Sequence, residues 1–283
     1  MGNRIMIWRS NFSSGQRLEP VALSPEPVSL DEATRQLPSG SYTTFRTFGL
    51  KRVLRLSSHF ERLEESARLS GQLLDLDREK IRQDIRGVIG CNPSGEVRIR
   101  IILDLEKQPG TIFYLSEGLR VPSQQDYERG VRVVTREMHR TNPEAKLTAF
   151  VERADAVRQQ LPVGTNEAIM VSSDGKLLEG LSSNFFAVRG SAVWTAGEGV
   201  LPGITRSLVI ETIRELSIPL KMNAIHIQDL PELEEAFITS ASRAVLPVTE
   251  IDGQPVGSGL PGQITKRIMD AYWKKIEAEL EEI

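Results

Sequence analysis

The sequence has 283 residues, enough to bury a large hydrophobic core and to form two domains of ordinary size. Its 35 lysine and arginine residues stand against 38 aspartate and glutamate residues, a net charge of −3, which excludes a strongly basic protein that binds nucleic acid through its overall charge. The single cysteine, Cys91, excludes a disulfide framework and a cysteine-rich metal site, and we expect no metal.

The same features bear on location. A lone cysteine is typical of a reducing compartment. The N-terminal segment from Met1 to Trp8 lacks the apolar run of a signal peptide, and no segment reaches the roughly 20 apolar residues of a membrane span. We therefore predict a cytoplasmic protein with no membrane partner.

The first half of the chain mixes strand and helix patterns. Residues 42–48 alternate bulky and β-branched side chains, as a strand does, whereas apolar residues recur every three or four positions along 59–69, as in a helix. The expected elements are, in chain order, strands at 42–48 and 53–54, helices at 59–69 and 77–88, and strands at 96–103 and 110–115.

The second half begins after a polar stretch, 122–129, which we interpret as a linker. Asp174-Gly175 suits a tight hairpin turn that needs positive φ. The expected elements are a strand at 130–135, a helix from Lys146 to about 160, hairpins over 167–179 and 184–195, a helix at 205–216, a strand at 235–240 and a helix at 264–280.

Many strands around few helices indicate an α+β protein of two domains. We expect a small N-terminal α/β domain at 1–121, the linker at 122–129 and a larger C-terminal domain at 130–283.

Three segments carry groups suited to one cofactor. Lys146 follows Asn-Pro-Glu-Ala, and a lysine with a lowered pKa can form an imine with an aldehyde. Glu179 ends an aliphatic run and begins Glu-Gly-Leu-Ser-Ser-Asn-Phe. The segment 203–205 opens a helix, whose free N–H groups favour an anion such as phosphate. A protein needs these parts to hold pyridoxal phosphate and to use it as an electron sink.

This order of motifs resembles the class IV pyridoxal-phosphate enzymes, which include branched-chain aminotransferase, D-amino-acid aminotransferase and aminodeoxychorismate lyase. His59-Phe-Glu-Arg62-Leu63 matches the HxxRL motif of that family. The resemblance covers residues 40–257 and leaves out the first 38. It implies the two-domain fold of the D-amino-acid aminotransferase-like enzymes, pyridoxal 5'-phosphate in the cleft between the domains, and a homodimer.

The resemblance also implies roles for individual residues. Lys146 would form the internal aldimine and then transfer the proton, and Glu179 would pair with the pyridine nitrogen. Ala241 stands where the aminotransferases often have threonine, so Ser240 or Ser242 would supply that hydroxyl. The further residues expected to bind the cofactor are Arg62, Leu201, Gly203, Ile204, Thr205 and Ser242. The candidates for binding the substrate are Tyr42, Thr43, Arg46 and Arg98, with Arg100 on the same strand face as Arg98.

Departures from the family patterns bear on the reaction. Branched-chain aminotransferases have a tyrosine and a glutamate where this chain has Val151 and Ser183, and the Ser-Ser-Asn sequence before Phe185 is closer to D-amino-acid aminotransferase. By contrast, Thr43 and Glu152 resemble the lyase. We predict an amino-acid aminotransferase acting on an amino acid and a 2-keto acid. The alternatives are an aminodeoxychorismate lyase that forms 4-aminobenzoate and pyruvate, and a non-catalytic binding module.

Overall fold

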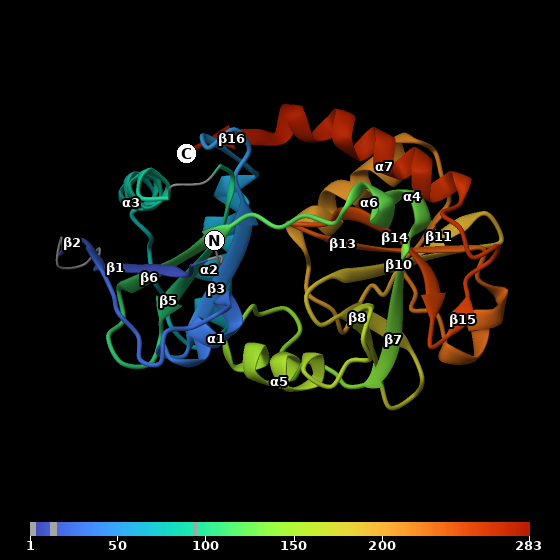
Figure 1. Ribbon diagram of the computed structural model, residues 1–283, viewed down its shortest axis with the longest axis horizontal. Helices are drawn as coiled ribbons and strands as arrows, with labels where there is room; N and C mark the ends of the chain where they lie inside the picture. Colours follow the sequence, from blue (N-terminus) through green and yellow to red (C-terminus); the bar gives the residue numbers. More distant parts are fainter. Residues whose placement is uncertain (1–3, 12–15, 93–94) are drawn as a thin grey trace. The chain divides into compact units, whose positions relative to one another are not determined.

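The computed structural model describes residues 4–11, 16–92 and 95–283 (Figure 1). The described chain divides into two compact units. Unit 1 runs up to Arg120 and also takes in Ala145–Asp155 and Glu279–Ile283. Unit 2 comprises Val121–Glu144 and Ala156–Ala278. Two segments that the predicted boundaries assign to the C-terminal domain, one of them containing Lys146, therefore belong to unit 1.

Unit 1 is built on an antiparallel sheet with the strand order β2-β1-β6-β5-β3. The strands are β1 (Met6–Asn11), β2 (Gln16–Pro20), β3 (Gly40–Arg46), β5 (Val97–Asp104) and β6 (Thr111–Gly118). Its helices are α1 (Leu30–Arg35), α2 (Leu56–Leu69) and α3 (Arg78–Gly90). The strands and helices predicted for residues 42–115 are confirmed, whereas β1, β2 and α1 were not predicted.

Side chains alternate between the two faces of this sheet, as the period of a strand requires. Phe45 and Ile99 pack in one hydrophobic cluster with Phe60 of α2 and residues of α3. Tyr42 and Ile102 pack on the other face, in a cluster that contains residues of α1. Neighbouring residues of β3 therefore face different surroundings.

The C-terminus completes unit 1. The helix predicted at 264–280 is α7 (Gln263–Ile276), which ends earlier than expected. It is followed by a 3₁₀ turn, η2 (Glu277–Glu279), and by strand β16 (Leu280–Glu282), which pairs with β4 (Arg52–Leu54). The Arg55 backbone amide donates to the Glu279 carbonyl, and its side chain pairs with the Glu279 carboxylate at 2.7 Å. These long-range bonds outweigh the helical pattern at its end.

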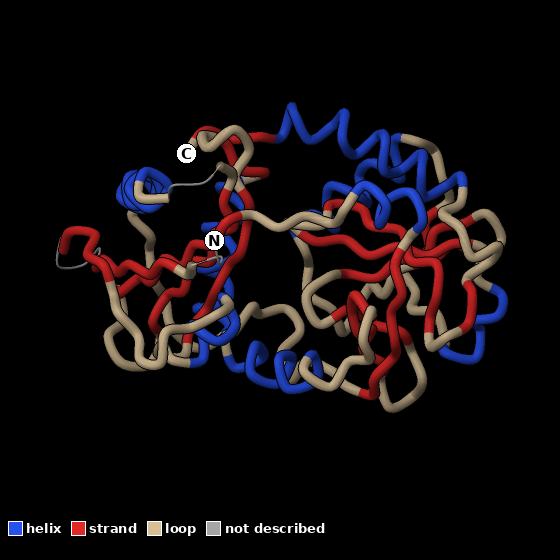
Figure 2. Tube along the Cα trace, in the orientation of Figure 1, coloured by secondary structure: helices blue, strands red, loops and turns tan. Residues whose placement is uncertain are grey.

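Unit 2 contains a second sheet, whose strands are drawn in red in Figure 2. The strands are β7 (Val131–Glu137), β8 (Thr165–Val171), β9 (Leu177–Gly180), β10 (Asn184–Arg189), β11 (Ala192–Trp194), β12 (Leu220–Lys221), β13 (Glu235–Ser240), β14 (Ala244–Ile251) and β15 (Gln254–Pro255). The order β10-β13-β14-β7-β8-β9 closes on itself because β9 also pairs with β10. The residue pair that closes this ring is Glu179 with Asn184.

The helices of unit 2 are α4 (Gln124–Arg129), α6 (Ile204–Glu215) and α7, with the 3₁₀ turn η1 (Ile227–Glu232). The predicted hairpins, the strand at 235–240 and the helix at 205–216 are confirmed. The predicted linker contains α4, which begins with a capping box between Ser123 and Asp126.

Helix α5 (Ala149–Arg158) begins three residues later than predicted. Leu147 instead forms an antiparallel β-bridge with Ser41 of β3, and its neighbours Lys146 and Thr148 bond to the same strand. The Tyr42 amide donates to the Lys146 carbonyl at 2.9 Å, and the Thr148 amide donates to the Gly40 carbonyl at 2.9 Å. Pairing with the edge of the sheet therefore displaces the helix start.

Candidate active site

Lys146 is held through its main chain on both sides. Its amide donates to Ser66 Oγ of α2 at 3.0 Å, and its carbonyl accepts the Tyr42 amide of β3. The side chain is half-buried, and its Nζ lies 4.8 Å from the centroid of the Tyr42 ring. The edge of the sheet and α2 thus fix the backbone of Lys146, while the Tyr42 ring lies beside its ammonium group.

A second cation and a buried histidine lie near Lys146 in unit 1. His59 is 4% exposed, and its Nδ1 lies 2.5 Å from Thr43 Oγ1. Burial, followed by the charges of Arg62 and Lys146, holds the pKa of His59 well below its ordinary value of 6.5. His59 is therefore neutral at pH 7. The structure brings together Lys146, Arg62, Tyr42 and Thr43, four of the residues predicted for the site.

Arg46 and Arg98 face each other on neighbouring strands of unit 1. Arg46 pairs with Glu96 at 2.5 Å, and Arg98 pairs with Glu117 at 3.0 Å. Arg100 is 4% exposed and pairs with Asp31 at 2.7 Å. Each of these three guanidinium groups therefore already has a carboxylate beside it within unit 1.

Glu179 is the centre of a buried polar cluster in unit 2. Its side chain is 3% exposed. Oε1 accepts from Arg140 Nε at 2.6 Å and from the Leu201 amide at 3.1 Å, and Oε2 accepts from Asn184 Nδ2 at 3.0 Å. An ionised carboxylate only accepts hydrogen bonds, so these three donors match the charged form. The arrangement fixes both oxygens of the carboxylate in a dry environment.

The start of α6 lies beside this cluster. Asn184 Nδ2 also donates to the Leu201 carbonyl at 2.9 Å. A Cβ at Gly203 would lie 2.1 Å from Asn184 Oδ1, so a side chain there would collide with Asn184. Gly203 is the N-cap of α6 and provides no side-chain cap, although Ile204 and Thr205 are buried. The first amides of α6 therefore lack the acceptor that a capping side chain would supply.

The end of β13 and the connection 241–243, which joins it to β14, carry further hydroxyl groups. Thr239 is 1% exposed and pairs across the sheet with Asn184, so the two side chains share a face. Within the described residues, Thr239 Oγ1 is a buried atom without a hydrogen-bond partner. Ser242, predicted to bind phosphate, is half-buried in the same connection. A buried hydroxyl without a hydrogen-bond partner could donate to an acceptor group on a bound ligand, such as a phosphate oxygen.

The charged residues Arg140, Glu167 and Arg243 were not predicted for the site from the sequence. Arg140 is buried and pairs with Glu179. Glu167 of β8 is 1% exposed and pairs with Arg243 at 3.1 Å. Charged side chains in an otherwise apolar strand, as in Glu167-Ala-Ile-Met-Val, are the signal that could have indicated a buried pair.

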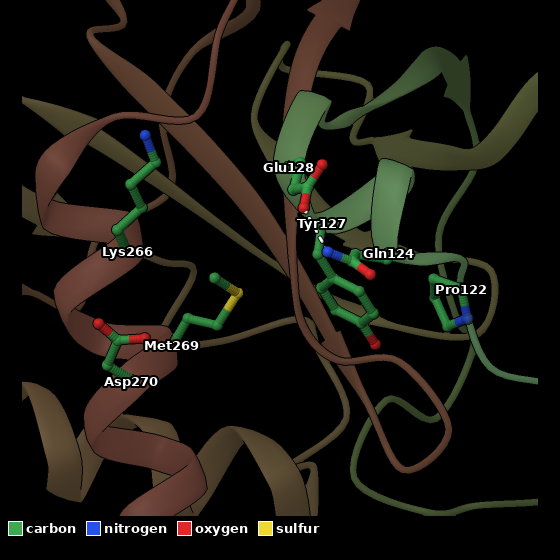
Figure 3. Close-up of a pocket in the computed structure, with 7 residues that line it drawn as sticks. All are labelled: Pro122, Gln124, Tyr127, Glu128, Lys266, Met269 and Asp270. Carbon is green, nitrogen blue, oxygen red and sulfur yellow. Dashed lines mark hydrogen bonds between the residues drawn. The ribbon is translucent and has the colours of Figure 1, made fainter.

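A separate hollow of about 510 Å³ lies over α4 and α7 of unit 2 (Figure 3). Gln124 donates to Glu128 at 2.6 Å along its α4 wall. Its lining residues are Pro122, Gln124, Tyr127, Glu128, Lys266, Met269 and Asp270. None of the residues predicted for the active site lines it.

Comparisons with known proteins agree with this geometry. Residues 40–251 match the family model described as amino-transferase class IV. The chain is 28% identical over 278 residues to a probable branched-chain-amino-acid aminotransferase of Thermotoga maritima, covering 95% of this chain and 94% of that protein. It is 26% identical over 266 residues to the D-alanine aminotransferase of Bacillus licheniformis, covering 89% and 93% of the two chains.

Solved structures give the same result. The crystal structure of a putative branched-chain amino acid aminotransferase from Thermotoga maritima superposes with a TM-score of 0.79 at 25% identity and covers 96% of each chain. The family match spans three quarters of the sequence, and it contains Lys146, Arg62, Glu179 and the start of α6. The chain therefore belongs to the class IV aminotransferases, a family of enzymes that depend on pyridoxal phosphate.

Proposed function

We propose that this protein moves an amino group between an amino acid and a 2-keto acid, with Lys146 as the residue that transfers the proton. The observation that carries this proposal is the buried Glu179 carboxylate, held by three donors in a fixed orientation. Unit 1 supplies Lys146 and Arg62, and unit 2 supplies Glu179 and the start of α6. We propose that the residues of each unit bind pyridoxal phosphate or act on its substrate.

The residues of unit 2 fit the two ends of this cofactor. Glu179 would hold a proton on the pyridine nitrogen, because a fixed negative charge in a dry environment favours the charged partner. When bound, pyridoxal phosphate supplies a protonated pyridine ring that withdraws electrons from the substrate Cα. Leu201 would pack against the ring, and Asn184 keeps Leu201 beside Glu179.

The phosphate has matching donors. The uncapped, buried start of α6 offers amide groups and the positive end of the helix dipole through Gly203, Ile204 and Thr205. The buried Thr239 hydroxyl lies near the end of β13, and Ser242 lies on the connection from β13 to β14, where Ala241 cannot contribute a hydroxyl. Arg62 of unit 1 would add a charge-assisted bond.

The chemistry of Lys146 is a proton transfer. Its Nζ would take the proton from the substrate Cα and return it at C4′ of the cofactor. The main-chain bonds to Ser66 and Tyr42 fix the backbone from which the Lys146 side chain extends, and so limit the positions that Nζ can reach. The Tyr42 ring, whose centroid lies 4.8 Å from Nζ, is the proposed substrate contact beside this lysine.

The other substrate candidates have different surroundings. Arg46 and Arg98 would have to exchange Glu96 and Glu117 for a substrate carboxylate. Thr43 bonds His59 on the face of β3 that is covered by α2, so we propose that it orients His59.

The comparisons do not favour the lyase or the non-catalytic module, because the relatives are named as aminotransferases. The two residues that resemble the lyase are Thr43 and Glu152. Thr43 is bonded to His59, and Glu152 is exposed on the first turn of α5. A hydroxyl and a carboxylate in these positions do not by themselves indicate the lyase reaction.

We also propose that the protein acts as a cytoplasmic homodimer, as the family resemblance implies. Among the described residues, no helix is both long and apolar enough to cross a membrane. Large apolar side chains such as Leu73 and Val163 are 85% and 100% exposed and could contribute to a subunit contact. Sedimentation of the purified protein would show a mass twice that of the chain, and a monomer at all concentrations would contradict a dimer.

The test of the proposed reaction is acceptor dependence. The purified holoenzyme is incubated with branched-chain L-amino acids, with D-alanine and with aminodeoxychorismate, each with and without a 2-keto acid. We expect one turnover per site on an amino acid without the keto acid and many turnovers with it, because the amino group must leave the cofactor. Repeated turnover of aminodeoxychorismate to pyruvate without an acceptor would show the lyase instead.

A further inference from the structure

We propose that Glu167 is a positioning residue for this reaction: it holds the turn at Leu181–Ser183 and, through that turn, keeps Asn184 against Glu179. This role rests on the proposed function of Glu179 as the partner of the pyridine nitrogen. Glu167 belongs to β8, which supplies none of the residues predicted for the site.

The contacts of Glu167 concentrate on one turn. Its Oε2 accepts from the Ser182 amide at 3.2 Å, from Ser182 Oγ at 2.8 Å and from Ser183 Oγ at 3.2 Å. Arg243 Nη1 donates to the same oxygen at 3.1 Å. A carboxylate that is 1% exposed needs such donors, since burial of an unpaired charge is costly. Three of the four come from two adjacent serines, so the position of this turn depends on Glu167.

The turn connects Glu179, the proposed partner of the pyridine nitrogen, to Asn184, which donates to it. Glu179 lies near the end of β9 and Asn184 begins β10, and these two residues pair directly. Inside the turn, the Gly180 amide donates to the Ser183 carbonyl at 2.8 Å. A shift of the turn would move Asn184 Nδ2 away from both Glu179 Oε2 and the Leu201 carbonyl. The carboxylate would then lose one of its three donors, and Leu201 would lose its anchor.

Gly180 shows how closely Glu167 approaches the turn. A Cβ at this position would lie 2.2 Å from Ser183 Oγ and 2.8 Å from Glu167 Cγ. No side chain larger than hydrogen fits there unless Glu167 and the turn move apart. The contacts of Glu167 thus explain the glycine and the two serines among the four residues that separate Glu179 from Asn184.

Arg243 extends the same network to the other end of the proposed cofactor site. Its Nη1 also donates to Ser182 Oγ at 3.1 Å. Its amide donates to Ser240 Oγ at 3.3 Å, and its carbonyl accepts from Tyr127 Oη at 2.9 Å. The connection between β13 and β14 is therefore tied to the turn through the ion pair with Glu167. One buried carboxylate supports both the Glu179 side and the phosphate side of unit 2.

The test is Glu167→Gln, which keeps the size of the side chain and removes its charge. In the holoenzyme, we expect a changed visible circular dichroism of the bound cofactor, because this signal reports how the ring is held. We also expect kcat of the half-reaction to fall by up to about a hundredfold, with KM changed much less. The dissociation constant of the cofactor, measured on apoenzyme, should rise as well.

Glu235→Gln is the matched control. Glu235 accepts from the amides of Ile264 and Thr265 at 3.0 and 2.6 Å and so caps α7, away from the proposed site. Its loss should lower the thermal midpoint while the visible dichroism and kcat stay as in the wild type. If Glu167→Gln lowers only the thermal midpoint, as this control does, the positioning role is refuted.

A second variant keeps the test decisive if Glu167→Gln does not fold. The double variant Ser182→Ala with Ser183→Ala removes the hydroxyl donors but leaves Glu167 and Arg243 in place. A change of dichroism and kcat in this variant supports the role of the turn, and wild-type values overturn it. A wild-type protein without bound-cofactor absorbance or half-reaction would instead contradict the proposed function, so the two failures are distinguishable.

Discussion

Replacing Glu179 by glutamine tests what the buried carboxylate contributes. Glutamine keeps an oxygen for Arg140 and for the Leu201 amide, which both donate to Oε1. Its amide nitrogen, however, would face Asn184 Nδ2, which is also a donor. The substitution therefore removes the charge and one of three hydrogen bonds while it leaves the shape of the side chain nearly unchanged.

The size of the effect follows from burial of the pair. Glu179 and Arg140 have side chains that are 3% and 5% exposed, with Oε1 and Nε 2.6 Å apart. Removing one partner of a buried ion pair destabilises a protein by about 3–5 kcal/mol. Because glutamine retains two acceptor contacts, we expect the lower end, about 3 kcal/mol in the free energy of unfolding. In catalysis, the loss of a fixed electrostatic partner should slow the half-reaction by about 10²–10³.

Two measurements separate these effects. Urea unfolding of the apoenzyme gives the stability, and single-turnover kinetics with saturating amino acid give the rate of the half-reaction. The double variant Glu179→Gln with Arg140→Met also removes the buried charge that faced Glu179, so we expect stability to recover while the rate stays low. If Glu179→Gln alone reacts within a few-fold of the wild type, the carboxylate does not act on the pyridine nitrogen.

Three further predictions concern single side chains. Arg62→Ala should raise the dissociation constant of pyridoxal phosphate about ten- to a hundredfold, because a charge-assisted bond is lost. Arg68→Ala, on the exposed side of the same helix, is the control and should leave this constant unchanged. Equal affinities of the two variants would rule out a contact between Arg62 and the phosphate. Since the pKa of folded His59 lies below 6.5, the unfolded chain binds this proton first as the pH falls. As the pH falls from about 7.5 through the ordinary pKa of 6.5, the wild type should therefore lose more stability in urea than His59→Gln, and parallel stability curves would refute the buried neutral histidine. Gly180→Ala should cost about 1–3 kcal/mol of stability, because its Cβ would lie 2.2 Å from Ser183 Oγ; unchanged stability would mean that the turn can relax.

Elements with a strong local pattern could be predicted from the sequence. The turn Asp174-Gly175 joins β8 to β9 as expected, and Gly175 has the positive φ of 81° that this turn requires. The alternation along 96–103 gave the strand β5, because its alternate side chains meet either α2 or α1. In these segments, local preference and tertiary packing favour the same conformation.

Elements that depend on distant partners could not be predicted in this way. The pattern of 264–280 continues past Ile276, but pairing of β16 with β4 ends the helix. Lys146 was expected at a helix start, yet it lies beside β3 through bonds to residues about a hundred positions earlier. In both cases, a sheet edge supplies hydrogen bonds that compete with the helix, and sequence periodicity does not show that edge.

The same limit applies to the candidate site. Sequence motifs indicated Lys146, Glu179 and the start of α6, because each of these features lies in a short segment of characteristic sequence. Arg140 and Glu167 were missed, since their roles come from partners that are distant in the sequence. Arg46 and Arg98 were predicted to bind the substrate, but each forms an ion pair with a carboxylate in the fold, Glu96 and Glu117 respectively. The sequence pattern does not show these ion pairs.

Lys146→Ala tests the central claim most directly, with Lys176→Ala, an exposed lysine paired with Asp174, as the matched control. Both proteins are reconstituted with pyridoxal phosphate, and the visible absorbance and the conversion to pyridoxamine phosphate on adding an amino acid are recorded. We predict that Lys146→Ala keeps the far-ultraviolet circular dichroism of the wild type but loses the protein-bound absorbance and all conversion, while Lys176→Ala behaves as the wild type. Normal conversion by Lys146→Ala would contradict the assignment of this lysine as the residue that transfers the proton.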